Sequence, residues 1–285
     1  MRHLVIGFIV LVAAASTAAA EPIKVVAAEN FYGDIARQIG GGEVAVASIL
    51  DNPDQDPHEF EASPSTARAF AEARVVIVNG VGYDEWATKL LNASPSSSRA
   101  VVTLAALLHV QTGANPHLWY DPAAIPALAK TLAALFAKLD PVHRADYARR
   151  LAMFQQSLEP LDARIAGLRA KYSGKPVTAT EPVFGYMAAA LGLHMRNKGF
   201  QLAVMNDTEP GPGAIAAIEK DLRSRAVRVL LYNSQTSEAL TRRMQKIAAQ
   251  SGVPVVGVSE TEPPGKDYQE WMLSQLGALD RALAR

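Results

Sequence analysis

The sequence predicts an α/β protein of two lobes, each with a mainly parallel sheet flanked by helices, joined by one long linker helix. Short runs of β-branched residues alternate with helical stretches from residue 21 onward. The alternation stops between residues 122 and 172 and restarts after residue 174. Repeated strand and helix units of this size are typical of parallel sheets covered on both faces. A chain of 285 residues is long enough for two such units.

Residues 1–20 are predicted to be a cleaved signal peptide. Residues 1–3 form a short basic segment, residues 4–12 are strongly apolar, and the alanines at 18–20 offer a site for cleavage after Ala20. The apolar run is about half of the roughly 20 residues that a membrane-spanning helix needs. We therefore expect export to the periplasm. The chain contains no cysteine, so a lipid anchor on cysteine is not expected, and a metal site would have to use histidine and carboxylate ligands.

The first lobe is predicted to span residues 21–140. Strands are expected from their β-branched, apolar character at residues 24–28, 44–50, 74–80 and 101–107. Helices are expected at residues 31–39, 64–73 and 86–91. Ser63 is the expected N-cap of the second of these helices, with Pro64 at its first position. The helix before it is expected to end at the glycines of residues 40–42.

The linker is predicted to span residues 141–173 as one long helix. Pro141 suits the first turn, and apolar residues then recur at helical spacing as far as Leu168. A helix of about 30 residues would reach roughly 45 Å, longer than one lobe is wide. Pro160 lies inside this helix and would clash with the carbonyl of Gln156, so a kink or local break is expected there.

The second lobe is predicted to span residues 174–285. Its strands are expected at residues 176–180, from 193 onward, 227–232 and 253–258. Its helices are expected at residues 183–191, 213–225, 237–251 and 268–283.

The charge of the chain excludes one class of partner. Lys and Arg number 28, Asp and Glu also number 28, and the basic residues are scattered along the sequence. Because nucleic-acid binding depends on a basic patch, we expect no nucleic-acid partner. We expect a monomer.

Two loop segments combine proline with histidine in the first lobe. His58 follows Pro57 in Asp-Pro-His-Glu-Phe-Glu, and His117 follows Pro116 in Asn-Pro-His-Leu-Trp-Tyr-Asp-Pro. Each segment comes after a predicted strand, which is where open α/β sheets bind ligands. A single histidine in a loop is usually a solvated surface residue, but two such motifs favour a shared site.

The chain resembles the metal-binding substrate-binding proteins of the zinc/manganese ABC importer family, periplasmic solute-binding proteins of cluster A-I type. Both Pro-His segments match the family's first two ligand segments, and the resemblance covers essentially the whole chain after residue 20. The resemblance implies Glu181, in Thr-Glu-Pro-Val-Phe-Gly-Tyr, as the third ligand and Glu260, in Ser-Glu-Thr, as the fourth. It implies lobes bridged by one long helix and delivery of the bound metal to an ABC importer permease.

The sequence departs from the family pattern around the fourth ligand. Glu260 stands where aspartate is more usual, and Glu262 is the alternative two residues on. Asn233 comes at the end of another predicted strand, where its amide could bind a ligand carboxylate instead of the metal. Asp121 could orient an imidazole or cap the following helix.

The proposed ligand set suits one divalent transition-metal ion per chain. Two imidazoles and two carboxylates cancel a charge of 2+, and first-row metals accept both ligand types. Manganese is slightly favoured over zinc, with iron also open, because two carboxylates suit Mn²⁺ or Fe²⁺ better than three histidines would. Zinc nevertheless binds nearly any such site more tightly than manganese.

The alternative from another functional class is a secreted zinc-dependent hydrolase. Catalytic zinc sites use similar residues but keep one coordination position open. The sequence has no His-Glu-x-x-His motif, and a fourth protein ligand would close the coordination sphere. We therefore expect a binding protein and not an enzyme.

Overall fold

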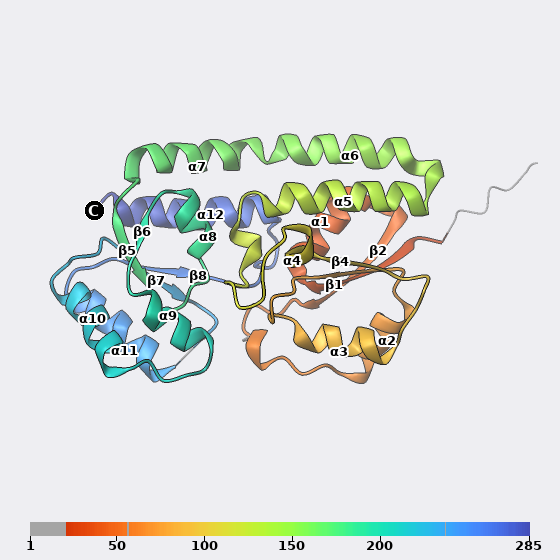
Figure 1. The fold of residues 1–285 in the computed structure, drawn as a ribbon. Helices are drawn as coiled ribbons and strands as arrows, with labels where there is room; N and C mark the ends of the chain where they lie inside the picture. Colours follow the sequence, from red (N-terminus) through yellow and green to blue (C-terminus); the bar gives the residue numbers. More distant parts are fainter. Residues whose placement is uncertain (1–20, 56, 237) are drawn as a thin grey trace, which may run out of the picture.

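Two four-stranded sheets lie side by side beneath a layer of helices in the computed structural model (Figure 1). The structure describes residues 21–55, 57–236 and 238–285, without the side chain of residue 58. The predicted signal peptide, residues 1–20, lies outside the described residues. Among the helices that the structure describes, none is both long enough and apolar enough to cross a membrane.

The first sheet has the strand order β2-β1-β3-β4, with every neighbouring pair parallel. Its strands are β1 (Ile23–Glu29), β2 (Val44–Leu50), β3 (Val75–Val78) and β4 (Ala100–Thr103). The helices of this half are α1 (Asn30–Gly40), α2 (Pro64–Glu72), α3 (Glu85–Ala93) and α4 (Leu104–Leu107). Short 3-10 turns lie at η1 (Gly41–Glu43), η2 (Pro57–Glu59) and η3 (Leu118–Tyr120).

The second sheet repeats this topology as β6-β5-β7-β8, again fully parallel. Its strands are β5 (Pro176–Ala179), β6 (His194–Met195), β7 (Leu230–Asn233) and β8 (Val255–Val258). Its helices are α8 (Gly185–Ala190), α9 (Lys198–Met205), α10 (Pro212–Arg223), α11 (Ala239–Gln250) and α12 (Tyr268–Leu283). The α/β prediction with two parallel sheets is confirmed.

The helical layer connects the two sheets. After α5 (Ala124–Leu139) and η4 (Pro141–His143), the chain crosses in α6 (Arg144–Ser157) and α7 (Glu159–Tyr172), which lie nearly in line (Figure 1). The break between them falls at Leu158 and agrees with the kink expected from Pro160. The proline has no N–H to donate to the carbonyl of Gln156, and it occupies the first turn of α7, where that donor is not needed.

One hydrophobic core extends across both sheets. It includes Val25 and Ile77 of the first sheet, Val177 and Leu231 of the second, and side chains of α1, α5, α7 and α12. Two smaller clusters cover the opposite faces, one under α2 and α3 and one under α9, α10 and α11. Each sheet is therefore covered on both faces, as its continuous runs of buried β-branched residues require.

Two local predictions were incomplete. Residues 104–107, expected to continue a strand, form α4, because Leu-Ala-Ala-Leu contains strong helix formers and no β-branched residue. Helix α9 was not predicted; it starts after Asn197, which has a left-handed conformation and makes no side-chain cap bond. Ser63 does cap α2, since its hydroxyl oxygen accepts the Thr66 N–H at 3.1 Å.

Candidate metal centre

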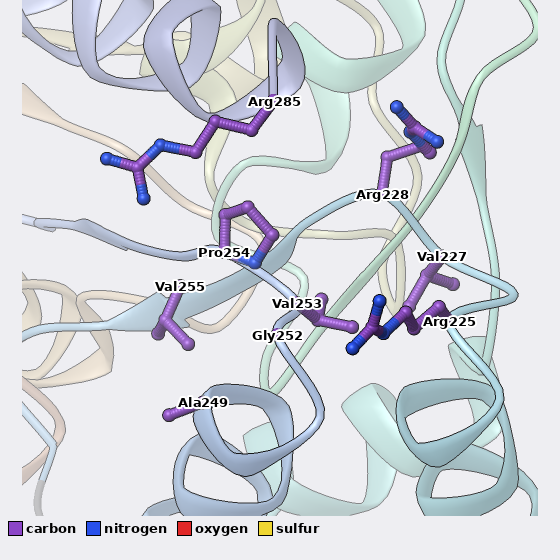
Figure 2. Close-up of a pocket in the computed structure, with 9 residues that line it drawn as sticks. All are labelled: Arg225, Val227, Arg228, Ala249, Gly252, Val253, Pro254, Val255 and Arg285. Carbon is purple, nitrogen blue, oxygen red and sulfur yellow. The ribbon is translucent and has the colours of Figure 1, made fainter.

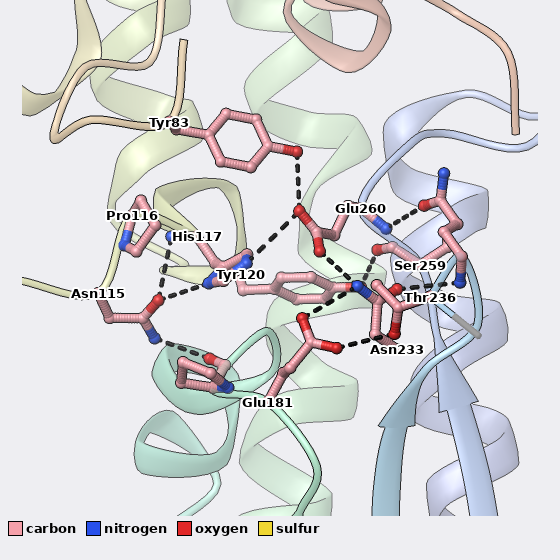
Figure 3. Close-up of polar contacts among 12 residues, drawn as sticks. Tyr83, Asn115, Pro116, His117, Tyr120, Glu181, Asn233, Thr236, Ser259 and Glu260 are labelled. Atoms are coloured by element: carbon pink, nitrogen blue, oxygen red, sulfur yellow. Dashed lines mark hydrogen bonds and ion pairs between the residues drawn. The ribbon is translucent and has the colours of Figure 1, made fainter. Parts of the chain in front are cut away.

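Polar side chains from both halves of the molecule meet where the second sheet ends (Figure 3). Glu181 follows β5, Asn233 is the last residue of β7, and Glu260 follows β8. The loop that precedes η3 brings His117 to the same place from the first half. In an open parallel sheet the carboxyl ends of neighbouring strands share one edge, which explains why residues so distant in sequence converge.

His117 presents one unbonded nitrogen toward this cluster. Its side chain is fully buried, and its Nδ1 lies 2.5 Å from Oδ1 of Asn115. Its Nε2 lies 3.5 Å from Oε2 of Glu260 and has no hydrogen-bond partner among the described residues. Aromatic rings pack around the imidazole, with the ring of Trp119 centred 5.3 Å away. The free nitrogen therefore lies in a dry, enclosed setting next to a carboxylate.

The two glutamates are held close together by one amide. Asn233 Nδ2 donates to Oε2 of Glu181 at 3.2 Å and to Oε1 of Glu260 at 2.5 Å. Thr236 donates its hydroxyl to the other oxygen of Glu181 at 2.9 Å, and Tyr83 donates to the other oxygen of Glu260 at 2.8 Å. Glu181 is 4% exposed and Glu260 is fully buried. Two carboxylates so close together and away from water favour the binding of positive charge between them.

The structure separates Glu260 from Glu262. The side-chain oxygen of Gln235 accepts the backbone N–H of Glu260 at 2.6 Å and of Thr261 at 3.0 Å, which fixes the turn after β8. Two residues later the backbone of Glu262 pairs with the side chain of Asn30 on α1. The carboxyl of Glu262 then lines a different pocket, beside Asp34, where burial and the charge of Asp34 raise its pKa to about 9.

His58 lies in the 3-10 turn η2, and its side chain is outside the described part of the structure. The turn is tied to the cluster nearby, because Gln235 Nε2 donates to the carbonyl of Gln55 at 3.0 Å. Within the described residues no group of three or more His, Cys, Asp or Glu side chains is placed to hold a metal. The structure thus places His117 beside Glu260 and joins Glu260 to Glu181 through Asn233, and the four-ligand set stays a prediction.

Most of the chain matches one known protein family. Residues 25–282 match the family described as zinc-uptake complex component A, periplasmic. The chain belongs to this family. The manganese ABC transporter substrate-binding lipoprotein PsaA of Streptococcus mitis is 25% identical, over 99% of this chain and 97% of the relative. The iron ABC transporter substrate-binding lipoprotein MtsA of Streptococcus pyogenes is 23% identical, over 94% of this chain and 91% of the relative.

A solved structure has the same fold. The periplasmic zinc-binding protein TroA from Treponema pallidum superposes with a TM-score of 0.78 at 20% identity, covering 93% of this chain and all of that one. The resemblance stated from the two Pro-His segments is thereby confirmed at the level of the family, and the two-lobe fold at the level of the structure.

Two residues of this zinc-uptake component A member, Tyr83 and Asn115, were not predicted from the sequence to contact the proposed ligands. Tyr83 follows the Gly-Val-Gly turn after β3, and Asn115 was considered only as part of a motif, although each contacts a predicted ligand. Burial and the nearby charge of Glu260 raise the pKa of Tyr83 well above its usual value, so its hydroxyl keeps the proton that it donates. Asp121 accepts the N–H of Ala123 at 2.9 Å in the turn before α5, but the N-cap position of α5 is Ala123, which makes no side-chain cap bond.

The aromatic residues named near the ligands contribute to the enclosure. Trp119 and Phe184 are buried, and Tyr186 is half-buried. Tyr120 contacts Phe184 edge to face at 5.1 Å and donates its hydroxyl to the carbonyl of Ser259 at 2.8 Å. These contacts join the two halves of the molecule and exclude water from the neighbourhood of His117.

A separate pocket of about 470 Å³ lies at the opposite end of the second sheet (Figure 2). Arg228 precedes β7 and Pro254 precedes β8, so the pocket adjoins the amino ends of these strands. Arg225 and Arg285 also line it, and no Asp, Glu or His side chain does. Three guanidinium groups repel cations, so this lining is unfavourable for a metal ion.

Proposed function

We propose that this zinc-uptake component A member captures one divalent transition-metal ion per chain as cargo and delivers it to an ABC importer permease. The observation that carries the proposal is the buried Nε2 of His117, 3.5 Å from Glu260, beside a second buried glutamate held by the same asparagine. An unbonded imidazole nitrogen and two carboxylates are the donors that first-row divalent metals bind. Burying them together is costly unless a cation joins them.

The ligands we propose are His58, His117, Glu181 and Glu260. Two neutral imidazoles and two carboxylates balance a 2+ ion, and Asn233, Tyr83 and Thr236 hold the carboxylates in place. Glu262 is not proposed as a ligand, because its backbone pairs with the side chain of Asn30 and its carboxyl lines a different pocket beside α1.

Mn²⁺ or Zn²⁺ is the proposed cargo, and Fe²⁺ is also compatible with these donors. The names of the relatives mention manganese and iron, and TroA, which has the same fold, is described as zinc-binding. All three ions bind both histidine and carboxylate, so the type of ligand does not discriminate between them. Intrinsic affinity favours zinc over iron and manganese. The metal supplied in the cell therefore decides which of them is transported.

The chain is proposed to be a transport protein and not an enzyme. Catalytic zinc needs a coordination position open to water or substrate, whereas four protein ligands close a tetrahedral site. The relatives are substrate-binding components of ABC transporters by name, which agrees with this assignment.

The proposal includes how the chain is divided into lobes, linker and signal peptide. We propose lobes at residues 21–140 and 174–285, a linker at 141–173, and a signal peptide at 1–20 that is removed on export. The relatives are lipoproteins by name, whereas this sequence has no cysteine to carry a lipid. A freely diffusing, monomeric periplasmic protein is the form we propose.

Metal titration of residues 21–285, stripped with a chelator, tests the function. Isothermal calorimetry with Mn²⁺, Zn²⁺ and anaerobic Fe²⁺ should give one ion per chain with a Kd below about 1 µM, equivalent to roughly −8 kcal/mol. Metal-loaded protein should hydrolyse no ester, peptide or phosphate substrate. Binding weaker than this for all three ions, or metal-dependent turnover, would reject the proposal.

A further inference from the structure

The side chain of Asn115 is engaged at both ends of its amide. Oδ1 lies 2.5 Å from Nδ1 of His117 and also accepts the backbone N–H of His117 at 3.2 Å. Nδ2 donates to the carbonyl of Pro182 at 2.7 Å. Pro182 directly follows Glu181, so one side chain contacts a segment from each half of the molecule next to a proposed ligand (Figure 3).

The Pro182 contact determines which way the amide faces. A backbone carbonyl can only accept a hydrogen bond, so the atom next to it must be the amide nitrogen, and the oxygen must face His117. The amide oxygen can only accept, so Nδ1 of His117 carries the hydrogen. In the neutral imidazole the lone pair is then on Nε2, the nitrogen that lies 3.5 Å from Glu260.

Two further features hold this amide in place. Tyr186, on α8, donates its hydroxyl to the backbone carbonyl of Asn115 at 2.8 Å. Gly185 leaves room for the amide, because a Cβ at that position would lie 2.8 Å from Asn115 Nδ2. Any larger residue at 185 would have to displace the amide from Pro182.

We propose that Asn115 is a positioning residue that sets the tautomer of His117 and couples it to the Glu181 segment, so that it controls how long the metal is retained. This inference rests on the proposed function. While the two segments are in contact, the amide keeps Nε2 of His117 ready for the metal. When the two segments separate, the hydrogen bond from Asn115 to the Pro182 carbonyl is lost. The amide can then rotate, and the imidazole of His117 loses its fixed orientation. Asn115 therefore acts mainly on metal release.

The tautomer is tested first, in metal-free protein. Long-range ¹H–¹⁵N NMR of the His117 ring should show the Nδ1–H form in the wild type and in Asn115→Asp, which keeps an acceptor oxygen. Asn115→Ala should show a mixture of tautomers. The exposed Asn92→Ala in α3 is the matched control. This measurement needs no metal, so it remains decisive if the proposed function fails. A single Nδ1–H form in Asn115→Ala would overturn the tautomer assignment.

Metal release is tested by stopped-flow transfer of Zn²⁺ from loaded protein to a chromogenic chelator. Asn115→Ala should release Zn²⁺ about 10- to 100-fold faster than the wild type, the usual effect of losing a group that orients a ligand. Asn115→Asp should also release faster, because its carboxylate faces the Pro182 carbonyl. Gly185→Ala should do the same while keeping Asn115. Association rates should change less than release rates. Release rates equal to the wild type in all three variants, in protein of unchanged circular dichroism, would overturn the proposal.

Discussion

Nε2 of His117 and Oε2 of Glu260 lie 3.5 Å apart, and both side chains are completely buried although 143 positions separate them in the sequence. The distance is longer than a strong hydrogen bond and is compatible with two ligands that face a common ion. Burying either side chain alone would be unfavourable in free energy, because each carries polar atoms that lose their contacts with water and need another partner. Their proximity makes the site testable by single substitutions.

Removing the imidazole should abolish tight metal binding. His117→Ala removes one of the two proposed imidazole donors, and we expect a Kd for Zn²⁺ or Mn²⁺ at least about 100-fold weaker, at roughly 1.4 kcal/mol for each factor of ten. His58→Ala should have the same effect. Isothermal calorimetry measures both, with the exposed His194→Ala as control. Affinity near the wild type in either variant would remove that histidine from the ligand set.

The two acidic residues after β8 should behave differently. Glu260→Gln removes the charge next to His117 and should weaken metal binding about 100-fold or more, whereas Glu262→Gln should leave the Kd within about threefold, because its carboxyl lines the pocket beside α1. Competition with a fluorescent chelator compares the two variants directly. If Glu262→Gln were the weaker binder, the fourth ligand would have to be reassigned.

Asn233 should stabilise the metal-free protein. Its amide donates to both Glu181 and Glu260, so Asn233→Ala leaves two buried carboxylates without this donor. The free energy of unfolding in chelator should fall by about 1–3 kcal/mol. Asn233→Asp adds a third negative charge and should cost more, with part of the loss restored by Zn²⁺. Urea unfolding with and without Zn²⁺ measures this, and unchanged stability of both variants in chelator would show that the amide does not hold the carboxylates together.

Asp280 should make stability depend on acid pH. Its carboxylate on α12 accepts hydrogen bonds from Tyr172 at 2.7 Å, Lys171 at 3.1 Å and Arg164 at 2.9 Å, all on α7. These donors, Tyr172 first, lower the pKa of Asp280 to about 2. A carboxyl with a lowered folded pKa stabilises the protein above its unfolded pKa of about 3.9, and the contribution is lost as pH falls through about 2.

Asp280→Asn should accordingly be less stable than the wild type by on the order of 1 kcal/mol at pH 7, since its partners are partly exposed. The difference should shrink between about pH 4 and pH 2. Urea unfolding across this range tests it, with the exposed Asp207→Asn as control. A difference that stayed constant with pH would mean that the contacts do not depend on the charge of Asp280.

Local sequence signals were sufficient for most elements of the fold. The bounds of β2 and α12 agree with those expected, Ser63 caps α2, and Pro160 interrupts the long helix, because each of these features depends on residues a few positions apart. The alternation of strands and helices also predicts parallel sheets, since only crossover connections of that length join parallel strands. Of the two Pro-His segments, the structure places the side chain of His117 beside Glu260, and the role of both histidines as ligands stays a prediction.

The tertiary structure decided which side chains actually meet. Nothing in the local pattern distinguishes Glu260 from Glu262; the choice depends on Gln235 holding one turn and Asn30 holding the next. The roles of Asn115 and Tyr83 likewise depend on contacts made 67 and 177 positions away. Such contacts follow from the strand order and from the packing of two sheets on one core, and a linear pattern of residues carries little information about either.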